Sequence, residues 1–174
     1  MIVLRAEGSV VRSGLIEFIK TLPNGIVMAE IGCYAGESSE LFAQKVSKLY
    51  CIDTWMSTKG SRLDAFYKDF NEAENAFDRV VEKYPNKIIK LKGTSLEYAR
   101  WFKDSYFDLV YIDADHGYEA VCVDIKAWLP KIKKTGIISG HDYTSRWGGV
   151  RKAVLDLLGK PDKVFPDTTW VKKL

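Results

Sequence analysis

Cysteine is scarce in this sequence. There are only three, Cys33, Cys51 and Cys122, and no two of them form a Cys-x-x-Cys pair. An odd number of widely separated cysteines argues against a disulfide framework and against a cysteine-rich zinc site. We therefore expect reduced, packed thiols and a cytoplasmic protein.

Membrane-spanning segments and a charge excess are also missing. No stretch approaches the ~18 apolar residues of a membrane span, and the N-terminus lacks the basic and apolar regions of a signal peptide. We therefore expect no association with a membrane. The 26 Lys and Arg residues are balanced by 23 Asp and Glu, which leaves a formal net charge of +3. Such an even balance disfavours nucleic acid as a partner.

The composition is that of an ordinary globular protein. The chain has 174 residues, of which 47% are hydrophobic and 28% are charged. This length fits one domain on a prior of about 150 residues per domain. We predict a single domain over residues 1–174, with residues 1–25 as an N-terminal helical lead-in.

Short apolar runs alternate with segments of helical periodicity along the chain. Strands are predicted at residues 26–31, 49–52, 88–91, 107–112 and 137–138, with two short ones at 163–165 and 168–171. Helices are predicted at residues 10–22, 37–47, 63–84, 96–102, 121–129 and 150–158. This alternation predicts a doubly wound α/β fold with a parallel sheet, whose strands are buried on both faces. Ligands of such folds bind beyond the carboxyl ends of the strands.

The loop after the first predicted strand contains Gly32 and Gly36, which allow a tight turn and close approach of a ligand. Its spacing is not the G-x-G-x-x-G of dinucleotide enzymes. Glu37 also places a carboxylate where the helix would receive a pyrophosphate. S-adenosylmethionine has no phosphate and carries two cationic groups, so acidic residues around this loop would favour its binding. The alternative is that the glycines serve only the turn.

Two further strand ends carry candidate cofactor residues. Asp53 ends the second strand, where a carboxylate can accept hydrogen bonds from both ribose hydroxyls. The alternative for Asp53 is a helix cap or a solvated loop carboxylate. Ser95 follows the third strand, where a small hydroxyl could meet the adenine edge. Its alternative role is the N-cap of the next helix.

The only two histidines, His116 and His141, each lie close to an aspartate at the end of neighbouring predicted strands. Methyl transfer to a hydroxyl benefits from a base and from a metal that lowers the pKa of the hydroxyl. A metal-free arrangement would use either histidine as the base and Asp115 or Asp142 as the group that orients it. The alternative for each histidine is a hydrogen-bonding loop residue.

Together these motifs resemble those of class I S-adenosylmethionine-dependent methyltransferases, from about residue 26 to the C-terminus. The matching segments are Glu30-x-Gly32-x-x-x-Gly36-x-Ser38, Asp53 and the runs 107–116 and 136–143. Within that superfamily the matches are closest to small bacterial enzymes grouped with metal-dependent O-methyltransferases. The resemblance implies a Rossmann-like, mostly parallel seven-stranded sheet with an antiparallel last strand.

The resemblance also implies a set of cofactor residues. S-adenosylmethionine would be held by Glu30, Gly32, Tyr34, Gly36, Ser38, Asp53, Ser95 and Asp113. Amino-methylating enzymes of nucleic acids typically carry Pro-Pro and an aromatic residue after the acidic or amide residue of the fourth strand. Here Asp113 is followed by Ala-Asp-His, which disfavours methylation of a base nitrogen.

Macrolide sugar O-methyltransferases provide the pattern for a catalytic and metal site. In them an aspartate at the end of the fourth strand binds magnesium, a histidine three residues later is the base, and an acidic pair after the next strand completes the metal site. Asp113 and His116 match that spacing, and Asp142 matches the second acid of the pair. His141 stands where the pattern has glutamate. The implied metal ligands are therefore Asp113, His141 and Asp142, for Mg²⁺ or another divalent cation.

These expectations converge on one function. We expect transfer of a methyl group from S-adenosylmethionine to a hydroxyl of a small molecule, such as a sugar or a glycan precursor. Trp55, Trp147, Trp170 and other large apolar residues could line the acceptor pocket, and the alternative is that they build the core. The alternative is a non-catalytic cofactor-binding module or a subunit of a larger modification complex. The short N-terminal region favours that alternative, or a homo-oligomer in which a second copy completes the pocket.

Overall fold

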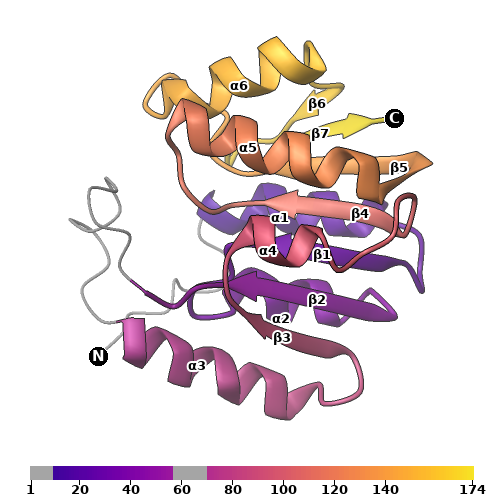
Figure 1. The fold of residues 1–174 in the computed structure, drawn as a ribbon, viewed down its shortest axis with the longest axis vertical. Helices are drawn as coiled ribbons and strands as arrows, with labels where there is room; N and C mark the ends of the chain where they lie inside the picture. The colour runs from indigo at the N-terminus through magenta and orange to yellow at the C-terminus, as the bar shows by residue number, and fades with distance from the viewer. Residues whose placement is uncertain (1–9, 57–69) are drawn as a thin grey trace.

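The computed structural model describes residues 10–56 and 70–174, and within them seven strands form one sheet (Figure 1). The strand order is β3-β2-β1-β4-β5-β7-β6. The strands are β1 (Val27–Ile31), β2 (Lys48–Asp53), β3 (Ile88–Lys92), β4 (Phe107–Ile112), β5 (Ile132–Gly140), β6 (Lys163–Val164) and β7 (Trp170–Lys173). Strands β1 to β5 pair in parallel, and β7 runs antiparallel to both β5 and β6. The predicted Rossmann-like methyltransferase fold is confirmed.

Helices cover both faces of the sheet (Figure 1). The α-helices are α1 (Val10–Thr21), α2 (Glu37–Ala43), α3 (Phe70–Lys83), α4 (Ser95–Ala99), α5 (Tyr118–Trp128) and α6 (Gly148–Leu158). Helices α1 to α3 contribute to one buried cluster and α4 to α6 to the other. None of the helices in residues 10–56 and 70–174 has the length and apolar character needed to cross a membrane. The predicted start of the third long helix, residues 63–69, lies outside the described residues.

Alternating side chains of the central strands explain the two clusters. Met28 on β1 belongs to the α1–α3 side, whereas its neighbours Ala29 and Ile31 belong to the α4–α6 side. Side chains of a strand point alternately to opposite faces, so a run that is apolar throughout fills both cores. β1 is accordingly an interior strand of the sheet, between β2 and β4.

The expectation that every strand is buried on both faces is wrong for the two edges. β3 is an edge strand in which only Ile88 is fully buried, and both residues of β6 are exposed. Lys90 of β3 instead reaches the acidic groups of Glu74 and Asp78 on α3, at 2.8 and 2.5 Å. Charged side chains on an edge strand oppose pairing with another chain.

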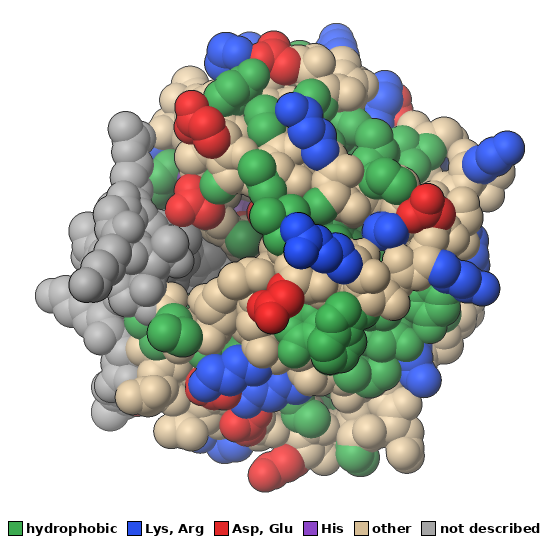
Figure 2. Space-filling view, viewed as in Figure 1, with side chains coloured by type: hydrophobic (Ala, Val, Ile, Leu, Met, Phe, Trp, Pro, Cys, Tyr) green, Lys and Arg blue, Asp and Glu red, His purple; other side chains and the backbone are tan. Residues whose placement is uncertain are grey.

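The surface carries charges of both signs. On the face seen in Figure 2, lysine and arginine side chains are interspersed with acidic and apolar ones. The carboxyl ends of the parallel strands all lie on one side of the sheet. The last residues of β1, β2, β4 and β5 there are Ile31, Asp53, Ile112 and Gly140. The candidate site is therefore formed by the loops that follow these four strands.

Candidate functional site

The glycine loop between β1 and α2 adopts left-handed backbone conformations at three positions. Gly32, Tyr34 and Gly36 have φ angles of 86°, 44° and 85°. A Cβ added to Gly32 would collide with the main-chain carbonyl oxygen of Asp113, so only glycine fits there. The Gly36 amide donates to the Cys33 carbonyl oxygen at 2.8 Å and closes the turn. The tight turn predicted from the two glycines is confirmed.

Asp53 clamps this loop. Its Oδ2 accepts hydrogen bonds from the amides of Cys33 and Tyr34 at 2.8 and 2.9 Å, and its Oδ1 accepts one from the Trp55 amide at 2.8 Å. A carboxylate offers about four acceptor positions, so about one is left for a ligand. The sequence reasoning missed this clamping role. A contact between Asp53 and the ribose stays a prediction, with room for about one hydroxyl beside the existing bonds.

Glu30 lies beneath the loop rather than on an open rim, with 0% of its surface exposed. Its Oε2 accepts hydrogen bonds from Ser39 Oγ at 2.5 Å and from Cys51 Sγ at 3.8 Å. Burial raises the pKa of Glu30 to about 7, although bonds from Ser38 and Ser39 act to lower it. Its Oε1 is buried without a hydrogen-bond partner among the described residues. An orphaned carboxylate oxygen below the loop fits a cationic ligand or a water molecule that carries one.

Burial of Glu30 makes the stability of the fold depend on pH. Its pKa is raised from 4.5 to about 7, so the folded protein binds more protons than the unfolded chain between these two values. Stability from this group is therefore greatest below pH 4.5 and falls by about 3 kcal/mol as the pH rises to 7. We expect Glu30→Gln to remove this fall.

Urea unfolding of both proteins at pH 5 and pH 8 measures the effect. The variant should gain stability relative to the unmodified protein at pH 8 and gain little at pH 5. Glu82→Gln, at an exposed position of α3, is the matched control. An equal pH dependence in Glu30→Gln and the unmodified protein would contradict the assignment.

Two buried cysteines complete the support of the loop. The sulfur atoms of Cys33 and Cys51 and a carboxylate oxygen of Glu30 lie within 4.8 Å of one another. Cys33 Sγ donates to the Glu30 carbonyl oxygen at 3.5 Å, and Cys51 Sγ donates to the Glu30 carboxylate. Burial raises the pKa of both thiols, which favours the neutral form. We interpret the cluster as a neutral hydrogen-bonded core and assign it no metal.

Ser95 takes part in helix packing. The N-cap of α4 is Thr94, whose side chain forms a capping box with Glu97, so the alternative of Ser95 as the N-cap is wrong. The Ser95 hydroxyl accepts a hydrogen bond from Trp128 Nε1 at 2.8 Å. The hydroxyl also bonds to Asp124. Burial raises the pKa of Asp124 to about 6, and the bond from Ser95 acts to lower it. A contact between Ser95 and adenine stays a prediction and competes with these bonds.

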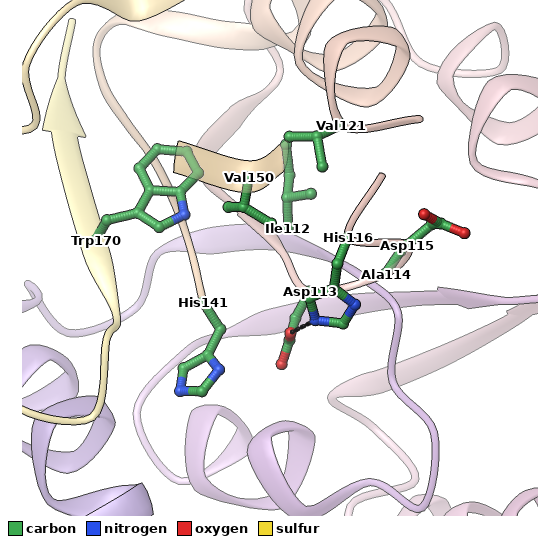
Figure 3. A pocket seen from close by; sticks show the side chains of 9 residues that line it. All are labelled: Ile112, Asp113, Ala114, Asp115, His116, Val121, His141, Val150 and Trp170. Atoms are coloured by element: carbon green, nitrogen blue, oxygen red, sulfur yellow. Dashed lines mark ion pairs between the residues drawn. The ribbon is translucent and has the colours of Figure 1, made fainter. Parts of the chain in front are cut away.

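The two histidines meet at one carboxylate, that of Asp142. Asp142 Oδ2 is hydrogen-bonded to His116 Nε2, and Asp142 Oδ1 lies 3.4 Å from His141 Nδ1. Asp113 Oδ1 lies 4.0 Å from His116 Nε2 (Figure 3). Asp115 instead accepts a hydrogen bond from the Gly117 amide at 2.6 Å. Asp115 and Asp142 were the two candidates for the group that orients His116. Only Asp142 is hydrogen-bonded to its imidazole.

Charge interactions outweigh burial at this centre. Burial acts to lower the pKa of His141, but the contact with Asp142 and the charge of Asp113 raise it to about 9. The same balance raises the pKa of His116. Burial acts to raise the pKa of Asp142, but its bonds with both histidines hold that pKa well below the usual range. A raised pKa makes the neutral imidazole a stronger base and stabilises the proton after transfer.

The predicted metal ligands are brought together. One ligand atom from each of Asp113, His141 and Asp142 lies within 4.8 Å of the others. Two carboxylates and one imidazole fit a divalent cation, with oxygen ligands for Mg²⁺ and a nitrogen ligand that also suits Mn²⁺, Fe²⁺ or Zn²⁺. Asp142 has a positive φ of 60°, which is uncommon for a residue other than glycine. Strain of this kind clusters at functional sites.

A small pocket opens beside the histidines, with polar side chains at one end and apolar ones at the other (Figure 3). Its lining residues are Ile112, Asp113, Ala114, Asp115, His116, Val121, His141, Val150 and Trp170. Trp170 lines this pocket, but its ring is buried in the core on the α4–α6 side, so its contact with an acceptor stays a prediction. Trp147 packs on the imidazole of His116, with ring centroids 4.5 Å apart and planes at 30°. No short-range signal in the sequence indicates this contact, because the two residues lie on different loops.

Comparison with known proteins identifies the family. A family model described as "Methyltransferase domain" matches residues 29–143, which include the end of β1, the glycine loop and both histidines. The chain belongs to this family of methyltransferase domains. The resemblance to class I S-adenosylmethionine-dependent methyltransferases, inferred from the sequence motifs, is thus confirmed.

Individual relatives of the methyltransferase domain are distant. An uncharacterized protein from Sinorhizobium fredii is 28% identical over 131 residues, which cover 70% of this chain and 14% of that protein. The chain therefore spans about one seventh of the length of this relative. A methyltransferase from Geobacter sulfurreducens has a TM-score of 0.65 at 15% identity, covering 99% of this chain and 80% of that one. An S-adenosylmethionine-dependent O-methyltransferase from Thermotoga maritima has a TM-score of 0.60 at 12% identity, covering 90% and 52%. At these identities the structural matches establish the fold alone.

Proposed function

We propose that this methyltransferase domain transfers a methyl group from S-adenosylmethionine to a hydroxyl of a small molecule, such as a sugar or a glycan precursor. The hydrogen bond between His116 and Asp142, at the carboxyl ends of β4 and β5, carries this proposal. A histidine oriented by an ionised carboxylate is suited to remove a proton from a hydroxyl. Amine methylation has less need of such a base, because a neutral amine is already a good nucleophile, whereas a neutral hydroxyl is a poor one.

The methyl donor is assigned to the glycine loop. When bound, S-adenosylmethionine would supply the methyl group for the acceptor oxygen, with its sulfur as the leaving group. The left-handed turn at Gly32 and Gly36 allows close approach of the ligand, and the orphaned Oε1 of Glu30 lies below the loop as a free hydrogen-bond acceptor, which a cationic ligand would favour in its ionised form. Asp113 follows β4, and its main-chain carbonyl packs directly against Gly32. The cofactor and the proposed base therefore belong to adjacent loops, which suits in-line transfer.

Residues of the chain would remove the proton, hold the cation and exclude water. His116 Nδ1, which has no hydrogen-bond partner among the described residues, would take the proton of the acceptor hydroxyl, and Asp142, bonded at Nε2, stabilises the resulting imidazolium. Asp113, His141 and Asp142 would hold a divalent cation, which lowers the pKa of a bound hydroxyl. Val121, Val150 and Trp170 exclude water at the apolar end of the pocket. The partner is thus a small-molecule acceptor, and a second copy of the chain would supply any further wall of the pocket.

A second candidate function is a cofactor-binding module or subunit of a larger modification complex. The Sinorhizobium fredii relative favours it, because this chain corresponds to only 14% of that protein. In this case the domain binds S-adenosylmethionine, and the acceptor is brought by another part of the assembly. Cofactor binding without turnover on any small molecule would support this candidate.

Dependence on a divalent metal is tested by screening methyl transfer from labelled S-adenosylmethionine to pools of sugars and phenols. We expect transfer to an acceptor hydroxyl that a chelator reduces by at least about tenfold and that added Mg²⁺ or Mn²⁺ restores. The physical reason is that a neutral hydroxyl is a poor nucleophile without help in losing its proton.

The control is the chelator pre-loaded with the metal, which should leave transfer unchanged. Transfer that a chelator does not affect would contradict the metal site and leave the His116–Asp142 pair as a metal-free base. Methylation found only on amines would contradict the choice of a hydroxyl acceptor.

A further inference from the structure

Trp55, two residues after the end of β2, is bound to the glycine loop. Its indole Nε1 donates a hydrogen bond to the Tyr34 carbonyl oxygen at 2.8 Å. Only 2% of Trp55 is exposed, and its ring packs on Phe77 of α3 with centroids 4.8 Å apart. The expectation that Trp55 lines an acceptor pocket is therefore wrong, because its ring is part of the core on the α1–α3 side of the sheet.

Tyr34 is held on both sides of its backbone by the short segment from Asp53 to Trp55. Its amide donates to Asp53 Oδ2 at 2.9 Å, and its carbonyl oxygen accepts from the Trp55 indole. Tyr34 has a φ of 44°, in the left-handed region that is unfavourable for a residue with a Cβ. Such a conformation persists only where the surroundings hold it in place. The two hydrogen bonds provide that hold.

Trp55 is itself anchored from several directions. Lys90 Nζ lies 4.8 Å from the centroid of the indole ring, and its position is fixed by ion pairs with Glu74 and Asp78 on α3. A cation over the face of an indole ring is attracted by the negative charge of the ring face. The Trp55 backbone is also left-handed, with a φ of 44°, and its amide bonds to Asp53. Contacts with Lys90, Phe77 and Asp53 therefore hold the indole N–H in place for its bond to Tyr34.

We propose that Trp55 is a positioning residue for the cofactor: its indole N–H holds the Tyr34 peptide in the left-handed conformation that shapes the cofactor loop. The proposal rests on the proposed function, because it takes the loop to be the binding site of S-adenosylmethionine. It deepens that function by assigning the preorganisation of the loop to one buried hydrogen bond. Without this bond the loop would have to be ordered by the ligand, which weakens binding.

Replacing Trp55 with phenylalanine tests the proposal, because it keeps an aromatic ring on Phe77 and removes the N–H donor. We expect the affinity for S-adenosylhomocysteine, measured by calorimetry well below the unfolding temperature, to fall about 5- to 30-fold. With an acceptor in hand, KM for S-adenosylmethionine should rise while kcat at saturation changes little, since the loop positions the cofactor and takes no part in proton transfer. Amide exchange at Cys33 and Tyr34 should become faster in the ligand-free protein.

Trp101→Phe is the matched control, because Trp101 is 71% exposed and lies in the turn that follows α4. It should leave affinity and loop exchange unchanged. If Trp55→Phe folds poorly, 3-benzothienylalanine placed at position 55 keeps the ring volume and removes only the donor. Affinity and loop exchange equal to those of the Trp101 control would overturn the proposal. If the unmodified protein does not bind S-adenosylhomocysteine, the proposed function fails, and loop exchange alone decides whether Trp55 holds the loop.

Discussion

Replacing His116 with alanine is expected to reduce methyl transfer by about 10²- to 10⁴-fold, the usual contribution of a general base. The affinity for S-adenosylhomocysteine should stay within about twofold of its original value. The reason is geometric: the imidazole is bonded to Asp142 after β5, whereas the loop between β1 and α2 is held by Asp53 and Trp55. Turnover on the acceptor found in the screen and calorimetric binding of S-adenosylhomocysteine measure the two quantities separately.

Two aspartate variants sharpen this test. Asp142→Asn keeps the shape of the side chain but removes the charge that stabilises the imidazolium and weakens a proposed metal ligand, so its loss of turnover should be at least as large as that of His116→Ala. Asp115→Asn should have a much smaller effect, because Asp115 bonds to the Gly117 amide and not to the imidazole. Full turnover in His116→Ala, or a larger loss in Asp115→Asn than in Asp142→Asn, would contradict the assignment of the base.

Replacing Gly32 with alanine is expected to destabilise the fold by about 3 kcal/mol or more and to abolish cofactor binding. The new Cβ would meet the Asp113 main-chain carbonyl oxygen and the Ala114 Cα, both of which belong to rigid backbone beyond β4. The left-handed φ of 86° adds a second penalty. Either the loop or the end of β4 must move, and both contribute to the site.

Gly25→Ala separates these two costs. Gly25 also has a left-handed backbone, with a φ of 77°, but an added Cβ would meet nothing within 4 Å. It should therefore lose only about 1–2 kcal/mol and bind S-adenosylhomocysteine normally. Denaturant unfolding and calorimetry compare the two variants. Equal losses in both, or retained binding in Gly32→Ala, would show that close packing of the loop on β4 is unimportant.

Local patterns in the sequence were enough to predict the sheet and the edge at which the site lies. The apolar runs that became β1, β2 and β4 end at Ile31, Asp53 and Ile112, within a residue of their predicted ends. β5 is longer than predicted, because it begins at Ile132 and passes through the polar Lys133 and Lys134. Its pairing with β4 also shifts register between Phe107 and Leu109, and a sequence pattern does not report such an irregularity.

The roles of individual acidic residues could not be predicted in the same way, because they depend on contacts between distant segments. Asp142 reaches both histidines only because Ile112 of β4 pairs with Gly140 of β5 and brings the two following loops together. Glu30 was expected to contact the cofactor, but it is buried beneath the loop and Ser39 of α2 bonds to it. Burial of this kind follows from how a helix packs on the sheet, which the spacing of residues in β1 does not reveal.

The central claim is that the loop after β1 binds a phosphate-free, cationic nucleoside. Calorimetric titration of the unmodified protein with S-adenosylhomocysteine and, separately, with NADH tests it most directly. We predict binding of S-adenosylhomocysteine at one site, lost in Gly32→Ala, and no binding of NADH. Binding of NADH without binding of S-adenosylhomocysteine would contradict it.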